Sequence, residues 1–305
     1  MEKSHGAAGV KILNIGSLNI DHVYQVDHIV KPGETIASRA LKTVGGGKGA
    51  NQTLALARAG AAVLHAGKVG ADGGWLAQTL AAAGADVRWL QTAAAAATGH
   101  AIIQLSTAGE NAIVLHGGAN RTLTMADLLP ALDERAPGDI VLIQNEINLN
   151  AEIIAAAAAR NLKVCLNPAP FEAQVRDWPL AKVSLLVLNE HEAQGLLGTG
   201  QPWSAASIQE LHRRLPAAEI IVTQGAHGVL YRSAAEAHWL PAEKVRVVDT
   251  TAAGDTFIGY FLACRARALP VAESLRLANR AAGLCVSRLG AMDSIPTWAE
   301  VAGPG

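Results

Sequence analysis

Short apolar runs typical of β-strands alternate with alanine-rich helical stretches along most of this chain. The strand-like runs cover residues 11–16, 62–69, 140–143, 163–166, 185–188 and 220–223. Strand–helix–strand alternation predicts a parallel sheet, because parallel neighbours need crossover connections. Several runs, such as 140–143, are apolar at consecutive positions, as expected for central strands that helices cover on both faces. The sequence therefore predicts an α/β fold with a mostly parallel central sheet.

Two stretches interrupt this series. Residues 21–44 and 100–116 alternate apolar and polar side chains around turns at Pro32-Gly33 and Ala108-Gly109. Such alternation is typical of strands with one solvated face, so we expect a small antiparallel sheet that projects from the main domain as one layer. Residues 226–248 also have the pattern of hairpin strands.

The composition excludes several classes of protein. The chain has 305 residues, 50% of them hydrophobic, which suits one large α/β domain or two smaller ones. Its 25 Lys and Arg against 26 Asp and Glu give a net charge of −1, which argues against binding to nucleic acid or a membrane surface. The longest apolar run, 153–159, is far shorter than the roughly 20 residues that span a bilayer.

The cysteines and the amino terminus bear on the compartment. Cys165, Cys264 and Cys285 form no CxxC pair and lie in apolar stretches, so we expect buried free thiols in the reducing cytoplasm. Residues 1–9 lack the apolar region of a signal peptide. We expect a flexible leader over residues 1–10 and a single folded domain over residues 11–305.

A glycine run, Gly45-Gly-Gly-Lys-Gly-Ala-Asn-Gln52, leads directly into a helical stretch. Its backbone would let a ligand approach amides at a helix N-terminus, and Lys48 and Asn51 offer side chains that suit ligand hydroxyls. The run is no Walker A loop, since glycine follows Lys48. It is no dinucleotide fingerprint either, since residues 63–69 supply no acidic side chain for a ribose. An ordinary glycine turn is the alternative.

The segment 248–257 combines small residues with an acidic residue at the start of a predicted helix. Amides of Ala252, Ala253 and Gly254 would face negative charge that develops on a transferring phosphoryl group. Asp255, in the first helical turn, would accept a proton from an attacking hydroxyl. The alternative is that Asp255 only caps the helix.

Polar residues follow several predicted strands. Asn189 and Glu192 lie three apart at a helix start and would share one face, as a water-mediated Mg²⁺ or phosphate site requires, although a solvated helix entry would explain them too. Ligands of open α/β sheets bind at the carboxyl ends of the strands, where we place Asn19, Asp21, Glu146 and Asn167. The sequence contains no HExxH motif, zinc-like Cys/His spacing or GxSxG elbow.

Taken together, these segments resemble the ribokinase-like, or PfkB, family of carbohydrate kinases over about residues 11–296. The two family signatures match residues 45–57 and 249–257. Further segments resemble those of the ribokinases within this family, at residues 16–21, 32–35, 117–120 and 166–170.

The resemblance implies a fold and an assembly. It implies a three-layer α/β/α sandwich with a projecting antiparallel β-lid formed by about 19–44 and 99–117. The lid of this family covers the sugar and pairs with a second subunit, so we expect a homodimer. Closure of the lid would exclude water and limit hydrolysis of ATP.

The resemblance also implies ATP-dependent phosphorylation of the 5-hydroxyl of D-ribose. Asp255 matches the catalytic base, and Ala252, Ala253 and Gly254 match the anion hole. Sugar contacts would come from Asn19, Asp21, Gly47, Lys48, Asn51 and Glu146. Nucleotide contacts would come from Asn189, Thr223, Gln224, Gly225, Ala226, His227, Gly228, Gly254 and Asn279.

Two metal ions belong to the same implied site. Glu192 matches the residue that organises Mg²⁺ through water. A site for the activating cation K⁺ would involve Asp249, Thr251, Cys285, Arg288, Gly290 and Ser294, mostly through main-chain carbonyls.

The chain departs from the usual ribokinase pattern at Gly45, Asn145, Asn148 and Ile258, positions that bear on which sugar is used. Deoxyribose, another neutral sugar and a nucleoside are alternative substrates. A phosphofructokinase-type enzyme would need more cationic sugar contacts than Lys48. A non-catalytic sugar sensor would tolerate loss of Asp255 or Lys48, and both residues are present.

Overall fold

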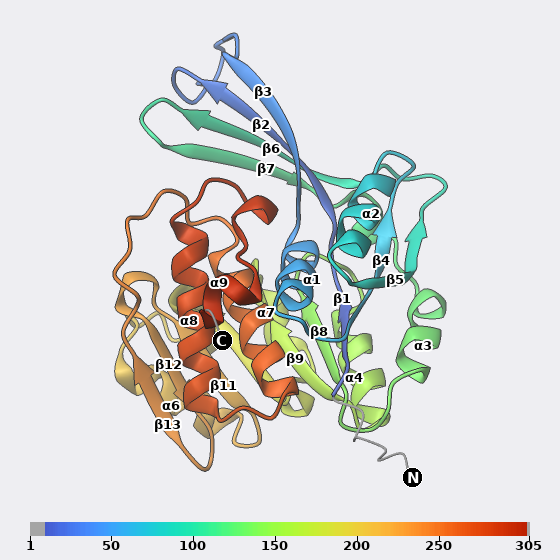
Figure 1. Ribbon diagram of the computed structural model, residues 1–305, viewed down its shortest axis with the longest axis vertical. Helices are drawn as coiled ribbons and strands as arrows, with labels where there is room; N and C mark the ends of the chain where they lie inside the picture. The colour runs from blue at the N-terminus through green and yellow to red at the C-terminus, as the bar shows by residue number, and fades with distance from the viewer. Residues whose placement is uncertain (1–9, 304–305) are drawn as a thin grey trace.

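Nine strands form one large, mostly parallel sheet in the computed structural model, which describes residues 10–303 (Figure 1). In spatial order they are β13 (Ala237–Leu240), β12 (Val229–Arg232), β11 (Glu219–Thr223), β10 (Leu185–Asn189), β9 (Lys163–Asn167), β8 (Ile140–Gln144), β1 (Ile12–Ile15), β4 (Val63–Val69) and β5 (Asp86–Thr92). The seven strands from β11 to β5 pair in parallel, which confirms the parallel sheet. Of the leader expected over residues 1–10, all but Val10 lies outside the described residues.

The strands β12 and β13 form an antiparallel hairpin at one edge of this sheet. They account for the first half of the hairpin pattern over 226–248. Residues 241–249 continue without a strand among them, so the alternation of Val245 and Val247 there does not reflect sheet pairing. Their exposed apolar side chains lie in an irregular connection that leads to the next helix.

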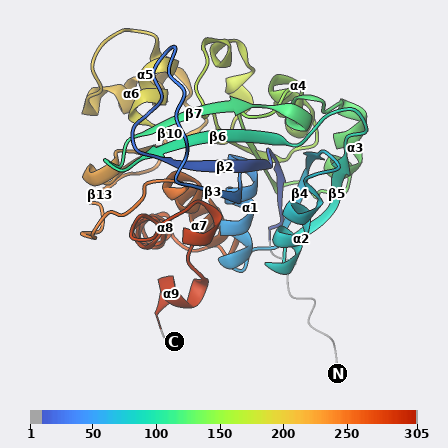
Figure 2. The ribbon, with the colours of Figure 1, turned by 90° about the horizontal axis from the view of Figure 1, so that it is seen from above.

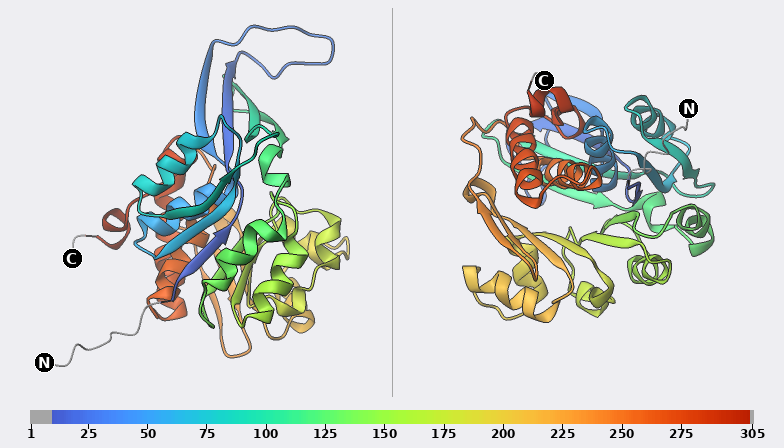
Figure 3. Two further views of the ribbon diagram at one scale, coloured as in Figure 1. Left: turned by 90° about the vertical axis from the view of Figure 1, so that its right-hand side faces the viewer. Right: turned by 60° about the horizontal axis from the view of Figure 1, so that its bottom comes forward.

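Helices cover both faces of the sheet and give three layers (Figure 3, right). On one face lie α1 (Lys48–Arg58), α2 (Gly74–Ala82), α7 (Ala253–Ala266), α8 (Val271–Val286) and α9 (Trp298–Ala302), which share one buried apolar cluster with the sheet. On the other face lie α3 (Met125–Asp133), α4 (Asn150–Ala159), α5 (Glu190–Leu197) and α6 (Ala205–Arg214), around a second cluster. The strand β8 is buried at every position, as its continuous apolar run predicts.

Short 3-10 turns complete the chain. They are η1 (Gly118–Arg121), η2 (Ala173–Asp177), η3 (Leu180–Lys182), η4 (Gly225–His227) and η5 (Met292–Ser294). Among the described residues, no helix is both long and apolar enough to cross a membrane.

A second sheet of four strands projects beyond the carboxyl ends of the main sheet (Figure 1; Figure 3, left). Its order is β3 (Ala40–Gly46), β2 (Asn19–Val26), β6 (Gly99–Ser106) and β7 (Asn111–His116). We call this sheet the lid. Viewed from above, its strands cross the top of the molecule between the helices of the two faces (Figure 2).

The lid strands pair as two antiparallel hairpins, β2 with β3 and β6 with β7, as the alternating patterns predict. The central pair, β2 with β6, is parallel. The reason lies in the connections, since β2 follows β1 and β6 follows β5. Both leave the same edge of a parallel sheet in the same direction, so they meet side by side running the same way.

Candidate active site

A cavity of about 500 Å³ lies where the lid, the carboxyl ends of the central strands and the start of α7 meet. Its lining includes all six predicted sugar contacts and all four residues predicted for the base and the anion hole. Besides Gly254, which is also a predicted nucleotide contact, it includes three more of the predicted nucleotide and Mg²⁺ residues, namely Asn189, Glu192 and Thr223. Asn167, placed at a strand end by its sequence context, lines it as well. Of the lid strands, β2 contributes Asn19 and Asp21, whereas β6 and β7 contribute mainly apolar side chains, at Ala101, Ile103, Ile113 and Leu115, together with Asn111.

Asp255 lies in the first turn of α7 and is 7% exposed. Its carboxylate does not cap the helix, because the N-cap is Ala252 and no side chain caps it. Instead Oδ2 accepts a hydrogen bond from Asn51 Nδ2 at 3.0 Å, and Oδ1 accepts one from Gln52 Nε2 at 2.8 Å. Asn51 is one of the predicted sugar contacts, and Gln52 carries no predicted role in the site.

The start of α7 has the geometry of an anion site. Ala252 adopts a left-handed conformation, with φ at 60°, which turns the chain sharply into the helix. The amide of Ala253 donates to the Thr250 carbonyl at 3.3 Å, so it is partly engaged within the turn. Amides in the first turn of a helix have no acceptor within the helix, which makes that of Gly254 a donor for a ligand anion.

Glycines of the run 45–52 allow a close approach to the turn between β1 and β2. A Cβ on Gly49 would overlap the backbone of Ser17, and one on Gly46 would overlap the carboxylate of Asp21. Gly47 has φ at 89° and forms the N-cap of α1. The glycines of this run therefore permit close packing, as in an ordinary glycine turn, and the run also lines the cavity, as in a ligand-binding loop.

Two of the predicted sugar contacts that line the cavity, Asp21 and Glu146, are carboxylates. Glu146 Oε2 accepts hydrogen bonds from Ser17 Oγ at 2.5 Å and from the Lys48 amide at 2.9 Å. Burial, with a smaller contribution from the charge of Glu146, raises the pKa of Asp21 to about 7. Burial tends to lower the pKa of Lys48, but the carboxylates of Asp255, Glu146 and Glu192 together raise it above its ordinary value. Lys48 is therefore charged and surrounded by acidic groups.

Asn19 is oriented by Asn120, a buried residue of η1. Asn120 Nδ2 donates to Asn19 Oδ1 at 2.8 Å, while Asn120 Oδ1 accepts from the Leu18 amide at 3.0 Å. Because the Asn19 carbonyl is engaged, its NH₂ group is the part that remains for a ligand.

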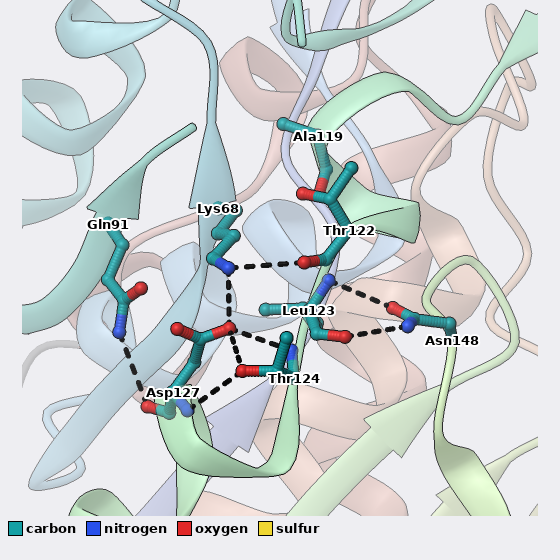
Figure 4. A network of polar contacts seen from close by, with 8 residues as sticks. All are labelled: Lys68, Gln91, Ala119, Thr122, Leu123, Thr124, Asp127 and Asn148. Carbon is teal, nitrogen blue, oxygen red and sulfur yellow. Dashed lines mark hydrogen bonds and ion pairs between the residues drawn. The ribbon is translucent and has the colours of Figure 1, made fainter. Parts of the chain in front are cut away.

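The loop that carries Glu146 is fixed by polar contacts on its far side (Figure 4). Asn148 donates to the Leu123 carbonyl at 2.8 Å and accepts from the Leu123 amide at 3.2 Å. The start of α3 is held in turn by Lys68, which pairs with Asp127 and donates to the Thr122 carbonyl at 3.1 Å. This network attaches the Glu146 loop to β4 and η1.

The four departures from the ribokinase pattern have different surroundings. Asn145 Nδ2 donates to the Pro170 carbonyl at 2.7 Å, so Asn145, like Asn148, holds the loop. A Cβ on Gly45 would approach Met292 Sδ to 2.6 Å, a packing reason for glycine there. Among these four positions, Ile258 is the one that lines the cavity.

Asn189 and Glu192 form a capping box at the start of α5, in which each side chain accepts from the backbone amide of the other. Glu192 is 7% exposed, whereas Asn189 is exposed, so the interpretation as a solvated helix entry holds for Asn189 and is wrong for Glu192. Burial raises the pKa of the Glu192 carboxyl, against the opposing effects of its bond to Asn189 and of Lys48.

The other predicted nucleotide residues lie beyond the cavity lining. Residues 224–228 form the turn between β11 and β12, next to Thr223, which does line the cavity. Asn279, on α8, donates to the Pro241 carbonyl at 2.6 Å. The turn and this helix flank the irregular connection 241–249.

The predicted K⁺ residues gather behind the start of α7. Asp249 Oδ1 accepts from the Thr251 amide at 2.9 Å, and Asp249 Oδ2 accepts from the Gly290 amide at 2.9 Å. Cys285 Sγ lies 3.1 Å from Ser294 Oγ. The Arg288 side chain points elsewhere and pairs with Glu300, so that residue would contribute a carbonyl. Within residues 10–303, no three His, Cys, Asp or Glu side chains converge as a metal site.

Comparison with known proteins gives consistent matches. A family profile described as "pfkB family carbohydrate kinase" matches residues 10–298. The ribokinase of Bacillus subtilis (strain 168) is 37% identical over 291 residues, covering 94% of this chain and 96% of that protein.

Solved structures agree with this match. The crystal structure of ribokinase from Cryptococcus neoformans var. grubii serotype A in complex with ADP has a TM-score of 0.85 and 38% identity, covering 96% of this chain and 99% of that one. The structure of Arabidopsis thaliana ribokinase complexed with ribose and ATP has a TM-score of 0.84 and 28% identity, covering 97% and 98% of the two chains.

Proposed function

Because the chain belongs to the pfkB family of carbohydrate kinases, we propose that it transfers the γ-phosphoryl group of ATP to the 5-hydroxyl of D-ribose. One observation carries this proposal: Asp255, at the N-terminus of α7, shares a cavity with Lys48, Asn51 and the acidic sugar end. The two solved relatives described as bound to ADP, or to ribose and ATP, support these ligands.

The cavity supplies what an in-line transfer needs. Asp255 accepts the proton of the attacking hydroxyl, and the amides at the start of α7 stabilise charge on the phosphoryl oxygens. Asn19, Asp21 and Glu146 hold the sugar hydroxyls at the opposite end. Such a reaction depends on positioning and charge stabilisation, without a covalent intermediate.

This chain has residues that suit the two implied metal ions, Mg²⁺ and K⁺. Glu192 would hold Mg²⁺ through water, because Asn189 already occupies one site on each of its carboxylate oxygens. Asp249 and the carbonyls around Gly290 and Ser294 would hold K⁺. Mg²⁺ held there would neutralise charge on the phosphates, and K⁺ would add positive charge near the start of α7.

We further propose that the enzyme works in the cytoplasm as a homodimer joined through the lid. Its three cysteines are free and buried, as expected in a reducing compartment. The lid exposes Leu41, Ile102 and Val114 to solvent, an apolar surface that a second lid would cover.

The test is release of ADP over a panel of ribose, deoxyribose, fructose, adenosine and fructose 6-phosphate, with and without K⁺. We expect the highest kcat/KM for ribose and a higher rate with K⁺. Selective turnover of another member of the panel would assign the activity to that substrate, and no sugar-dependent ADP release would overturn the proposal.

A further inference from the structure

Three buried side-chain amides, of Asn14, Gln144 and Gln52, form a hydrogen-bonded chain that ends on Asp255. The proposed mechanism assigns no role to these three amides. Gln52 Oε1 accepts from Gln144 Nε2 at 2.7 Å, and Gln144 Nε2 also donates to Asn14 Oδ1 at 2.9 Å. Asn14, Gln52 and Gln144 are each 0% exposed. Asn51 lines the cavity, but its neighbour Gln52 does not.

The orientation of these amides is determined by the main chain. Asn14 Nδ2 donates to the Gly49 carbonyl at 2.8 Å. A carbonyl only accepts, so Asn14 presents its NH₂ group there and its own carbonyl to Gln144. Gln144 then presents its NH₂ group to Gln52. Gln52 must therefore present its carbonyl to Gln144 and its NH₂ group to Asp255.

A second anchor leads to the same orientation. Asn167 Nδ2 donates to the Val187 carbonyl at 3.0 Å, and Asn167 Oδ1 accepts from Gln52 Nε2 at 3.2 Å. Both ends of the chain of amides thus require Gln52 to be a donor. Oδ1 of Asp255 is held as an acceptor, and a proton on Oδ1 would meet the N–H of Gln52.

Close packing of two helices brings these groups together. A Cβ on Gly259 would overlap the Cβ of Ala55, so α7 and α1 approach one another closely at that point. Asp255 lies one turn before Gly259, and Asn51 lies one turn before Ala55. The contact between the helices is therefore continuous with the contact between Asp255 and the two amides.

We infer that Gln52 is a positioning residue for Asp255, an inference that rests on the proposed kinase activity. Gln52 holds Oδ1 as an acceptor, and Oδ2, beside the cavity residue Asn51, faces the sugar. The O–H bond of the sugar hydroxyl breaks and its proton passes to Oδ2. The hydroxyl oxygen bonds to the γ-phosphorus, and the bond from that phosphorus to ADP breaks with its electron pair on ADP.

The first test is Gln52→Met, which keeps the length of the side chain and removes the donor. We expect kcat to fall about 10- to 100-fold, because positioning errors of this kind act on the chemical step. The KM for the sugar should stay within about 3-fold, because Gln52 does not face the cavity. The acid limb of the kcat profile should move to higher pH, because the carboxylate loses a hydrogen bond to its charged form.

The second test is Gln52→Glu, which keeps an acceptor for Gln144 and replaces the donor by an ionisable carboxyl. Near neutral pH the introduced charge should repel Asp255 and reduce kcat at least as strongly as Gln52→Met. When the pH falls and the introduced carboxyl takes up a proton, it becomes a donor again, so the loss relative to the unmodified enzyme should shrink. This pH signature keeps the inference testable if Gln52→Met fails to fold.

Asp139→Asn is the matched control. Asp139 is a buried polar residue just before β8, where it accepts from the amides of Lys11 and Ala136 at 2.9 and 3.0 Å, remote from the carboxyl ends of the strands. It should lose stability and keep its kcat and pH profile.

The outcomes separate the two claims. Unchanged kcat in both Gln52 variants of an active enzyme would overturn the role of Gln52 alone. A loss of kcat that does not depend on pH and that Asp139→Asn shows to the same extent would also overturn it, because Gln52 would then contribute only to stability. Absence of sugar-dependent ADP release by the unmodified chain would overturn the proposed function and this inference with it.

Discussion

Asp255 is held by two amides that precede it by 204 and 203 residues in the sequence. At the other end of the cavity, Asn19 is held in the same manner by Asn120. In both places a polar side chain that lines the cavity is held by buried side-chain amides. Fixed side chains lower the cost of reaching a reactive geometry, which is the main contribution a protein makes to phosphoryl transfer.

Asp21→Asn should stabilise the protein at pH 8. The pKa of Asp21 is raised from 3.8 to about 7 by burial and by Glu146, so the folded state binds a proton more tightly than the unfolded state does. Stability is therefore lost as the pH rises from about 4 to about 7. The substitution removes this loss, on the order of 2 kcal/mol once partial exposure is allowed for. Denaturant unfolding at pH 4 and pH 8 measures it.

Asp72→Asn provides a control of opposite sign. Hydrogen bonds from the Thr98 hydroxyl and amide lower the pKa of Asp72, so this carboxylate adds stability above its unfolded pKa and loses it as the pH falls. Its substitution should reduce stability at pH 8. An Asp21→Asn variant that is less stable than the unmodified protein at pH 8 would contradict the account of the buried carboxyl.

At this scale the sequence predicts the residues that line the cavity better than those that support them. Asp255, Lys48 and Glu146 stand out because polar groups after apolar strands, or at a glycine-rich helix start, have few structural explanations. Gln52 and Asn120 carry no such signal, since a single amide on a helix is ordinary. Their role depends on residues more than 100 positions away, which a local pattern does not contain.

At the scale of elements, the approach of α1 to α7 determines the geometry of the site. Gly259→Ala should push the two helices apart, because the added methyl group overlaps Ala55. Overpacking of this kind costs about 1–3 kcal/mol. We also expect a lower kcat, since Asn51 and Gln52 would move away from Asp255. Thermal unfolding and steady-state kinetics on the same preparation measure both effects.

Gly74→Ala is the matched control, since Gly74 begins α2 and a Cβ there would meet no atom within 4 Å. It should gain up to about 1 kcal/mol from helix propensity and keep full activity. Normal kcat and normal stability in Gly259→Ala would show that the helix contact does not control the site.

The sequence predicts the central strands and most of the lid, because continuous and alternating apolar patterns reflect burial on two faces or one. It misses β5, whose sequence DVRWLQT is mostly polar and only partly buried at the edge of the sheet. It also misses the parallel pairing of β2 with β6. That pairing follows from where the two strands leave the main sheet, which is a property of topology and not of either strand's pattern.

At the scale of the whole molecule, the lid has one face toward the cavity and one toward solvent. Ala101, Ile103 and Ile113 line the cavity. Ile102 and Val114 pair across β6 and β7 on the opposite face, 43% and 66% exposed. We expect light scattering to give twice the 31.6 kDa mass of one chain.

Ile102→Glu combined with Val114→Glu should give a monomer, because paired charges would be buried without partners at the interface. Leu289→Glu is the control, because Leu289 lies outside the lid and is 64% exposed. This variant should remain dimeric. A strictly monomeric unmodified chain at micromolar concentration would contradict the dimer.

The central claim is that Asp255 is the base of a phosphoryl transfer. The most direct measurement is kcat and sugar affinity of Asp255→Asn, which keeps the shape of the side chain and removes its charge. General-base catalysis predicts a loss of about 10²- to 10⁴-fold in kcat with sugar affinity changed by only a few fold. A kcat close to that of the unmodified enzyme would contradict the account.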